Sequence, residues 1–377
     1  MRKHIIITKL FEFGGSNTHL KTLIKYFGED NIILLLEDES QLSYLKNIDA
    51  QGIHVKINAK LCAYAHLRYR FTTNVKEFIS IIRSILAIQF LSLKYGFADI
   101  TINTVEPEKY LYLLWVPFSK VVYILHTTPN KKYTSFTSFT CRVKLGKRKK
   151  IITVSNSNKN LICENWNIPD NKRPFVCVIY NCIVEKELNN KNTYREKNNK
   201  QYIVTLGHVI AYKNPHVWLE VAKLVTSVRE HINFIWLGNG PLLENCKALT
   251  QETKRIAFEG LVTNPHTYLK NALMYYQPSL FETHGIATVE AMSNYLPCIV
   301  SNVGGLPESI QHEYNGLLVH PEDVDEQANF IIRLIDNTEL RLKYGVNAHK
   351  KYEEFFSFNI FTSKMNAAYN IHMRESR

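Results

Sequence analysis

Two glutamates stand eight residues apart in the stretch FETHGIATVEAMSNYLPCIVSNVGGLPESI, which runs from Phe281 to Ile310. Glu282 and Glu290 bracket Gly285, Ile286 and Ala287, which lead into a predicted helix. The amides at the start of a helix are open to a ligand, and a carboxylate accepts two or more hydrogen bonds. This pattern favours a site in which carboxylates bind the hydroxyl groups of a sugar beside those amides.

Two other interpretations of the same stretch compete with a sugar site. Acids are common in the first turns of a helix because they oppose its dipole, so both glutamates could be ordinary helix residues. A pair of carboxylates could also serve a glycoside hydrolase. Against the hydrolase, the sequence contains no second acid cluster and no evident arrangement for activating a water molecule.

Further candidate residues follow other predicted strands. His208 and Lys213 lie in LGHVIAYKNP, where a cation beside a helix start would suit a diphosphate. Gly15 follows the first strand and opens a helix, and His126 ends a strand that is otherwise apolar. The simpler alternatives are a surface lysine, a tight strand-to-helix turn and a structural histidine.

Short β-branched runs alternate with helical patterns along the chain, which predicts parallel sheets with helices on both faces. In the first half the predicted strands are His4–Thr8, Ile32–Leu36, His54–Ile57, Asp99–Asn103, Lys120–His126, Ile151–Ser155 and Phe175–Tyr180. In the second half they are Tyr202–Leu206, Asn233–Leu237, Ile256–Phe258, Tyr276–Ser279, Cys298–Ser301 and Gly316–Val319. Since ligands bind at the carboxyl ends of such strands, the candidate residues stand where a site is expected.

The length of 377 residues and a break in the alternation predict two doubly wound α/β domains facing a cleft. The first spans residues 1–183 and the second residues 201–352. A polar segment at 184–200 is the predicted linker, and residues 353–377 are predicted to form a C-terminal helix that returns to the first domain.

Composition places the protein among cytoplasmic globular proteins. Hydrophobic residues make up 45%, no apolar run reaches the length of a spanning helix, and the N-terminus resembles a core strand more than a signal peptide. The seven scattered cysteines are expected to be reduced.

Charge is unevenly distributed between the two halves of the chain. Residues 1–200 hold 31 Lys and Arg against 16 Asp and Glu, whereas residues 201–377 hold 15 against 18. A basic stretch that includes Lys144, Lys147, Arg148, Lys149 and Lys150 predicts peripheral binding to an anionic membrane surface. A solvated basic face is the alternative. Nucleic acid is not expected as a partner, because it would leave the two glutamates unexplained.

These motifs together resemble the retaining glycosyltransferases of the GT-B fold, family 4, also called group 1 glycosyltransferases. The resemblance rests on the N-terminal Gly-Gly, the histidine after the fifth strand, LGH with YKNP, LGNGP, and above all the stretch around Glu282 and Glu290 with Gly304, Gly305 and Glu308. It runs in order along nearly the whole chain and is strongest from Leu206 to Val319.

The resemblance assigns a role to each candidate residue. Glu290 would bind the donor ribose, while Glu282 and the amides of Gly285, Ile286 and Ala287 would hold the donor sugar and its phosphate. Lys213 would neutralise the diphosphate. The family usually has arginine where this chain has His208.

The first domain would contribute the remaining two residues. Gly15 would let the first helix approach the diphosphate, and His126 would contact the transferred sugar. The catalytic set would then comprise Glu282, His126 and Lys213.

The resemblance also implies partners and a place of action. The expected activity is that of a retaining hexosyltransferase in cell-envelope polysaccharide synthesis, acting on a glycan or lipid-linked acceptor at the inner face of the membrane. A UDP-sugar is the first donor to consider, and neither a cofactor nor a metal is expected. Asp323 and Asp325 mimic a metal-binding motif but open a predicted helix, where acids are favoured. A non-catalytic sugar-binding subunit and a nucleotide-sugar epimerase are the alternatives.

Overall fold

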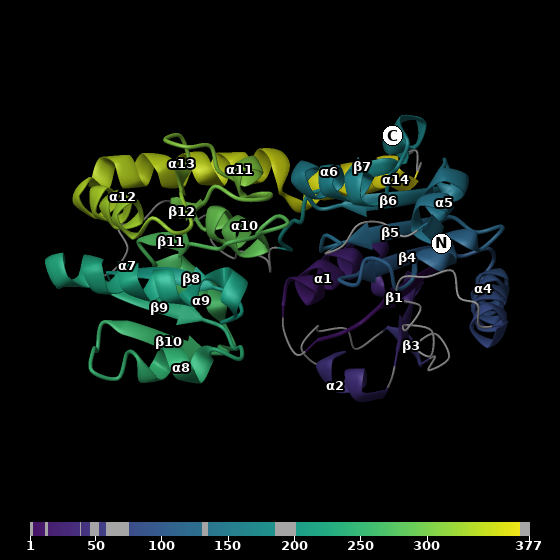
Figure 1. Cartoon of the computed structure of the whole chain (residues 1–377), viewed down its shortest axis with the longest axis horizontal. Helices are drawn as coiled ribbons and strands as arrows, with labels where there is room; N and C mark the ends of the chain where they lie inside the picture. Colours follow the sequence, from purple (N-terminus) through teal and green to yellow (C-terminus); the bar gives the residue numbers. More distant parts are fainter. Residues whose placement is uncertain are drawn as a thin grey trace. The chain divides into compact units, whose positions relative to one another are not determined.

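The computed structural model describes residues 3–11, 14–37, 39–45, 53–57, 75–129, 135–184 and 201–369. The chain forms two compact units (Figure 1). The first comprises Met1–Tyr180 and Phe361–Arg377, and the second comprises Asn181–Ile360. Of the predicted linker, residues 185–200 lie outside the described residues.

The first unit contains a parallel sheet of seven strands in the order β3-β2-β1-β4-β5-β6-β7. The order reverses between β1 and β4, so their carboxyl ends form the switch point where such sheets bind ligands. The strands are β1 (His4–Thr8), β2 (Ile32–Leu36), β3 (His54–Ile57), β4 (Asp99–Thr104), β5 (Val121–Leu125), β6 (Lys149–Thr153) and β7 (Val176–Val178). The helices between them are α1 (Gly15–Phe27), α2 (Leu42–Leu45), α4 (Val75–Lys94), α5 (Ser135–Lys144) and α6 (Asn156–Asn165).

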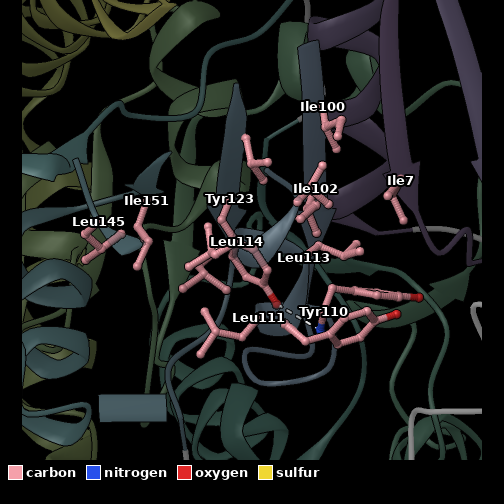
Figure 2. Close-up of a cluster of buried hydrophobic side chains, with 14 of the residues drawn as sticks. Ile7, Ile100, Ile102, Tyr110, Leu111, Leu113, Leu114, Tyr123, Leu145 and Ile151 are labelled. Carbon is pink, nitrogen blue, oxygen red and sulfur yellow. Dashed lines mark hydrogen bonds between the residues drawn. The ribbon is translucent and has the colours of Figure 1, made fainter. Parts of the chain in front are cut away.

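The core of the first unit packs against strands that are buried on both faces. β2 and β5 expose none of their residues, as expected for strands covered on both sides. Figure 2 shows Tyr123 of β5 among isoleucine and leucine side chains. Its hydroxyl donates to the carbonyl of Pro107 at 2.9 Å and accepts from the amide of Tyr110 at 3.3 Å, so this buried polar group is satisfied.

The second unit repeats the same topology with six parallel strands in the order β10-β9-β8-β11-β12-β13. Its switch point lies between β8 and β11. The strands are β8 (Tyr202–Leu206), β9 (Asn233–Leu237), β10 (Ile256–Gly260), β11 (Met274–Gln277), β12 (Cys298–Ser301) and β13 (Gly316–Val319). The helices are α7 (Pro215–Val228), α8 (Leu243–Ala248), α9 (Pro265–Asn271), α10 (Ile286–Ser293), α11 (Leu306–Ser309), α12 (Val324–Asp336) and α13 (Thr338–Phe355). The predicted doubly wound architecture is therefore confirmed in both units.

The C-terminal helical segment returns to the first unit. α13 ends at Phe355, and the final described helix, α14, spans Phe358–Tyr369. Tyr369 is buried, and its hydroxyl bonds to Thr101 of β4. Lys120 Nζ donates to the carbonyl of Tyr369 at 2.7 Å. These bonds attach the last described turn of the chain to the first sheet.

Lys149 corrects the expectation that the whole basic stretch faces a membrane. β6 begins at Lys149, two residues before the predicted start, and its side chain is buried. Its Nζ donates to the carbonyls of Val116 and Ser119, both at 2.6 Å. Burial and the nearby charges of Arg148 and Lys144 lower the pKa of Lys149 to about 7. Lys149 is therefore a structural residue.

No helix among the described residues combines the length and apolar character needed to cross a membrane. Of the six cysteines in this part of the chain, Cys141, Cys163, Cys177, Cys246 and Cys298 carry free thiols. The seventh, Cys62, lies outside the described residues.

The second core depends on an aromatic cluster beneath α7. Trp218 is fully buried, with its ring centroid 5.3 Å from that of Trp236 and 5.0 Å from that of Phe258. Its Nε1 donates to Thr205 Oγ1 at 2.7 Å. We expect Trp218→Ala to lower the free energy of unfolding by about 3–5 kcal/mol, because it leaves a cavity. Urea unfolding followed by circular dichroism measures this change.

The control for this experiment is Leu249→Ala, because Leu249 is exposed. That variant should change stability by less than about 0.5 kcal/mol. Equal effects of the two substitutions would show that the aromatic cluster does not determine the stability of the second unit.

Candidate functional site

Lys213 and Glu282 form an ion pair at the switch point of the second sheet. Lys213 follows β8 and Glu282 follows β11, and only 12% and 9% of their side chains are exposed. The loops that carry them are joined by a hydrogen bond of 2.8 Å from the amide of Leu280 to the carbonyl of Tyr212. Two residues that are distant in sequence thus meet where the fold is expected to bind a ligand.

Two further residues hold the carboxylate of Glu282, and the sequence analysis did not identify either of them. Gln277 Nε2 donates to Glu282 Oε1, and Ser279 Oγ donates to the same oxygen at 3.2 Å. Gln277 Oε1 accepts from the hydroxyl of Tyr275. A buried ion pair needs such additional bonds to compensate for the loss of hydration. The polar residues Gln277 and Ser279, which alternate within YYQPSLFE just before Glu282, could have indicated these partners. The sequence analysis places both residues in a predicted strand that ends at Ser279.

The Gly304–Gly305 pair fixes the backbone of Glu282. A Cβ atom on Gly304 would lie 1.8 Å from the carbonyl oxygen of Glu282, and one on Gly305 would lie 2.3 Å from that of Thr283. The amide of Gly305 donates to the carbonyl of Glu282 at 3.0 Å. The close approach of these two loops therefore requires glycine at both positions.

Gly285 starts α10 immediately after this loop. Its φ of 83° is in the left-handed region, and a Cβ there would lie 2.6 Å from Leu306. The amides of Thr288 and Val289 both bond to its carbonyl, so those of Ile286 and Ala287 precede the first turn of intrahelical bonds. These two amides carry the positive end of the helix dipole, which favours an anion.

Glu290 lies on α10 and is half-buried. Burial, and then the charges of neighbours that include Glu282 and Glu290, raises the pKa of Tyr275 well above its usual value. Both carboxylates are thus close enough to Tyr275 to affect the pKa of its hydroxyl, which shows that Glu282 and Glu290 lie in the same part of the second unit.

His208 lies within the electrostatic reach of Lys213. Burial and then the charge of Lys213 lower the pKa of His208 below its ordinary value, so its ring is neutral at neutral pH. Lys213 is therefore the cation of this pair.

The glycines of LGNGP allow two loops to pack closely, since a Cβ on Gly238 would lie 2.0 Å from the carbonyl oxygen of Gly207.

In the first unit, His126 is linked to α1 through two residues that the sequence analysis overlooked. His126 Nε2 lies 2.6 Å from Asn103 Oδ1, and His19 Nδ1 lies 3.1 Å from the same oxygen. Asn103 Nδ2 donates to Thr8 Oγ1 at 3.2 Å, so Oδ1 is left to accept from both rings. Gly15 begins the helix that carries His19.

Both histidines of this cluster are neutral. Burial lowers the pKa of His19 to about 4, against a partial opposing effect of its bond to Asn103. Burial and then the proximity of His19 lower the pKa of His126 well below its usual value. The two ring centroids are 4.5 Å apart, so two charges there would repel strongly.

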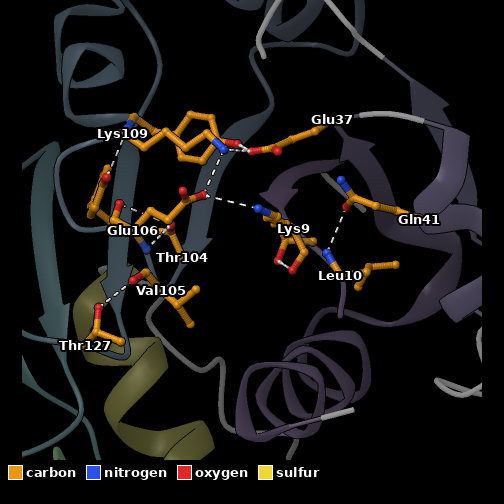
Figure 3. Close-up of polar contacts among 12 residues, drawn as sticks. Lys9, Leu10, Glu37, Gln41, Thr104, Val105, Glu106, Lys109 and Thr127 are labelled. Carbon is orange, nitrogen blue, oxygen red and sulfur yellow. Dashed lines mark hydrogen bonds and ion pairs between the residues drawn. The ribbon is translucent and has the colours of Figure 1, made fainter. Parts of the chain in front are cut away.

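An ion network lies at the carboxyl edge of the same sheet (Figure 3). Lys109 Nζ lies 2.5 Å from Glu37 and 2.8 Å from Glu106, and Tyr110 donates its hydroxyl proton to Glu37. Burial disfavours the charged lysine, but its bonds to Glu106 and Glu37 raise the pKa of Lys109 above its ordinary value. The network remains charged and connects β2 to the segment after β4.

Among the residues that the structure describes, no group of three or more histidine, cysteine, aspartate or glutamate side chains could hold a metal ion. Asp323 caps α12, as its Oδ1 accepts from the amide of Glu326 at 2.8 Å. The candidate residues thus form two groups. His208, Lys213, Glu282, Glu290 and the start of α10 lie in the second unit, and Gly15 and His126 lie in the first.

We expect the Lys213–Glu282 pair to show strong energetic coupling. Lys213→Met should lower the free energy of unfolding by about 3–5 kcal/mol, because it leaves a buried carboxylate without its cation. Lys213→Met combined with Glu282→Gln should cost less than the sum of the single changes. A double-mutant cycle in urea measures the coupling. The exposed pair Arg229–Asp336 is the control, and Arg229→Met should cost at most about 1 kcal/mol.

The buried histidine cluster predicts a dependence of stability on pH. Between pH 6.5 and about 4 an unfolded chain protonates His19 while the folded chain does not. The contribution of neutral His19 to the free energy of unfolding is therefore complete above pH 6.5 and is lost as the pH falls from 6.5 to about 4. His19→Gln should reduce the slope of unfolding free energy against pH by about 1 kcal/mol per unit near pH 5. The exposed His216→Gln is the control, and an unchanged slope in His19→Gln would contradict the assignment.

Comparison with known proteins connects the second unit to a family. The family described as "Glycosyl transferases group 1" matches residues 186–351. An uncharacterised glycosyltransferase of Methanocaldococcus jannaschii is 29% identical over 233 residues, covering 57% of this chain and 58% of the relative. An Escherichia coli UDP-Gal:alpha-D-GlcNAc-diphosphoundecaprenol alpha-1,3-galactosyltransferase is 30% identical over 152 residues, or 39% of each chain. These matches span less than two thirds of either relative.

Solved structures resemble the whole fold. Anabaena HepE, crystallised in complex with UDP and glucose, superposes with a TM-score of 0.71 and covers 98% of this chain and 100% of its own. Its sequence identity of 16% supports the fold alone. The paired doubly wound sheets are those of the GT-B fold. Residues 186–351, which lie within the second unit, match the group 1 glycosyltransferase family.

Proposed function

We propose that this protein is a retaining hexosyltransferase, which moves a sugar from a nucleotide-sugar donor to a glycan or lipid-linked acceptor. The observation that carries this proposal is the buried Lys213–Glu282 pair at the switch point of the second sheet, beside the start of α10. It combines a cation, oriented amides and a carboxylate, which are the groups needed for a diphosphate and a sugar.

The diphosphate of the donor would bind between Lys213 and the amides of Gly285, Ile286 and Ala287. An ammonium group has three donors, so Lys213 can retain its bond to Glu282 and still contact phosphate oxygens. With His208 neutral, Lys213 would carry the charge for which the family usually uses an additional arginine. This charge matters most in the transition state, as negative charge builds on the leaving group.

The two glutamates would divide the hydroxyl groups of the donor. Glu290, on α10, would accept from the ribose, and Glu282 would accept from the transferred sugar. All three bonds to the Glu282 carboxylate within the described residues reach Oε1, which leaves Oε2 for a sugar hydroxyl.

The first unit would supply the acceptor side. Gly15 would allow α1 to approach the diphosphate closely. The bond to Asn103 gives His126 its proton on Nε2, so its Nδ1 is an acceptor. His126 would then contact the sugar through hydrogen bonding and not through charge.

The transfer itself would proceed on one face of the sugar. The acceptor oxygen bonds to the anomeric carbon as the bond from that carbon to the phosphate oxygen breaks. The proton of the acceptor hydroxyl passes to the leaving phosphate, so no protein base is needed. The configuration is retained because the acceptor attacks from the face that the phosphate leaves. Lys213 and the α10 amides would stabilise the leaving diphosphate without a metal or another cofactor.

A role in cell-envelope polysaccharide synthesis is supported by the E. coli relative, whose name specifies UDP-Gal and a diphosphoundecaprenol-linked sugar. HepE was crystallised with UDP, which makes a UDP-sugar the first donor to test. For this chain we propose a cytoplasmic enzyme, bound peripherally to the inner face of the membrane.

A screen of UDP-, GDP- and ADP-sugars by thermal shift identifies the donor, because a ligand that binds only the folded state raises its stability. Analysis of the product's anomeric configuration then tests retention. Donor binding without transfer or donor hydrolysis would indicate a non-catalytic subunit. If the nucleotide sugar is converted to its stereoisomer when no acceptor is present, the protein is an epimerase.

Substitutions in the second unit should separate donor binding from turnover. Glu290→Ala should weaken donor binding by about 1–3 kcal/mol, because the ribose loses a charged acceptor. Glu282→Ala should reduce turnover more than it reduces binding of the free nucleotide. Calorimetry with UDP and steady-state kinetics measure the two effects.

The cation beside them should have the larger effect on turnover. Lys213→Ala should reduce activity at least about a hundredfold, as expected for loss of a group that stabilises transition-state charge. His208→Arg should be tolerated, and the exposed Glu220→Ala should match the wild type. Wild-type kinetics in Glu282→Ala, Glu290→Ala and Lys213→Ala would contradict the assigned site.

A further inference from the structure

The helix α4 is apolar on its outer face as well as on its inner face. Its inner face packs Ile81, Ile85, Ile88 and Leu91 on the core, and Ser80, Ser84, Gln89 and Ser92 are buried beside them. Its exposed positions are mostly apolar, namely Phe78, Ile79, Ile82, Leu86, Phe90 and Leu93. Phe90 is 70% exposed and Leu86 is 59% exposed. A usual surface helix has a single apolar stripe, which faces the core, so the second and exposed apolar face of α4 has no partner in the described part of the first unit.

Hydrogen bonds fix the rotation of α4 about its axis. Gln89 Oε1 accepts from the amide of Phe118 at 3.0 Å. Ser92 Oγ donates to the carbonyl of Ala98 at 2.7 Å and also bonds to Ser119 Oγ. Turning the apolar face inward would break these bonds and bury their partners unsatisfied, which costs about 1–3 kcal/mol for each group. The outward apolar face is therefore a property of the folded unit.

The exposed face extends from α4 to an adjoining loop. Phe118, whose amide is bound by Gln89, is itself 60% exposed. Arg148 Nη2 donates to the backbone carbonyl of Phe118, which holds a cation beside this residue. We define the α4 face as the exposed apolar residues of α4 together with Phe118. In Figure 1, α4 stands at the margin of the first unit.

The exposed charges described around the α4 face are mostly positive. Arg83, Lys94, Lys147 and Arg148 are exposed. Segments 78–98, 116–120 and 142–150 contain no aspartate or glutamate. Glu77, in the first turn of α4, is the nearest acid in the sequence. An apolar surface with an excess of cations around it complements a bilayer with anionic headgroups, where apolar groups enter the interface and cations remain with the phosphates.

We infer that the α4 face is a membrane-docking surface, which inserts its apolar side chains into the interface of an anionic lipid bilayer. The basic residues alone would give binding that disappears at high salt, because exposed charges are screened. Insertion of Leu86, Phe90 and Phe118 adds a component that salt does not remove. The inference does not depend on the proposed transfer activity, because binding to vesicles is measured without a sugar donor.

Cosedimentation of the full chain with lipid vesicles tests the inference. Vesicles containing phosphatidylglycerol should bind the protein, and vesicles of phosphatidylcholine alone should bind it at least about tenfold more weakly. Leu86→Ser combined with Phe90→Ser and Phe118→Ser should reduce partition to the anionic vesicles at least about tenfold at both low and high salt. Lys147→Gln combined with Arg148→Gln should reduce it mainly at low salt.

Leu224→Ser, Leu249→Ser and Val346→Ser together provide the matched control, since these residues are exposed apolar side chains of the second unit. This control should bind vesicles like the wild type, and thermal unfolding verifies that each variant is folded. A depth measurement adds a second readout, because the fluorescence of Phe90→Trp should be quenched by brominated lipid in anionic vesicles.

Several outcomes would overturn the inference. It fails if the wild type does not bind anionic vesicles, if the apolar triple variant binds like the wild type, or if neutral and anionic vesicles bind equally. A second copy of this chain could cover the α4 face instead of a membrane, and analytical ultracentrifugation distinguishes these two possibilities. A wild-type dimer that the apolar triple variant converts to a monomer, with vesicle binding unchanged, would assign the α4 face to a second copy of this chain.

Discussion

The second unit is organised around one buried ion pair, Lys213–Glu282, at the point where the strand order of its sheet reverses. The topology brings the loops after β8 and β11 together, and the pair connects them. Because two charges removed from water must be compensated, the neighbouring residues Gln277 and Ser279 are committed to the same carboxylate oxygen. Gly304 and Gly305 then follow from the need for a second loop to pack directly on the backbone of Glu282.

The first unit uses neutral polar groups where the second uses charges. At the ends of β4 and β5, Asn103 and His126 are joined to His19 of α1 in a cluster that burial keeps uncharged. The buried charges of the first unit lie elsewhere along the same edge of the sheet, in the network of Lys109, Glu37 and Glu106. In the proposed reaction this division is useful, because the diphosphate requires a cation and the sugar near His126 requires only hydrogen bonds.

The sequence was most informative where one physical signal dominates. Strands β1, β2, β8, β9, β12 and β13 have their predicted limits, because β-branched runs end sharply at glycine or polar residues. β11 was placed two residues late, since Pro278 and Ser279 extend the apparent run although proline donates no ladder bond. The positions of Glu282 and Lys213 could be anticipated from topology. Their contact, and the bonds of Gln277 and Asn103, could not, because they depend on register between strands far apart in the chain. Lys149 was misjudged because charge patterning contains no information about burial.

The attachment of α14 to the first sheet has a consequence for how the chain can be divided into fragments. Residues Asn181–Ile360 form a continuous stretch with a complete sheet, whereas the first unit incorporates Tyr369, which bonds to Thr101 and Lys120. A fragment that ends at Tyr180 would therefore lack α14 and leave Thr101 and Lys120 without these bonds, whereas a fragment spanning Asn181–Ile360 would keep every strand of its sheet. The first unit is thus discontinuous in sequence, and its separate expression requires joining α14 to the N-terminal segment.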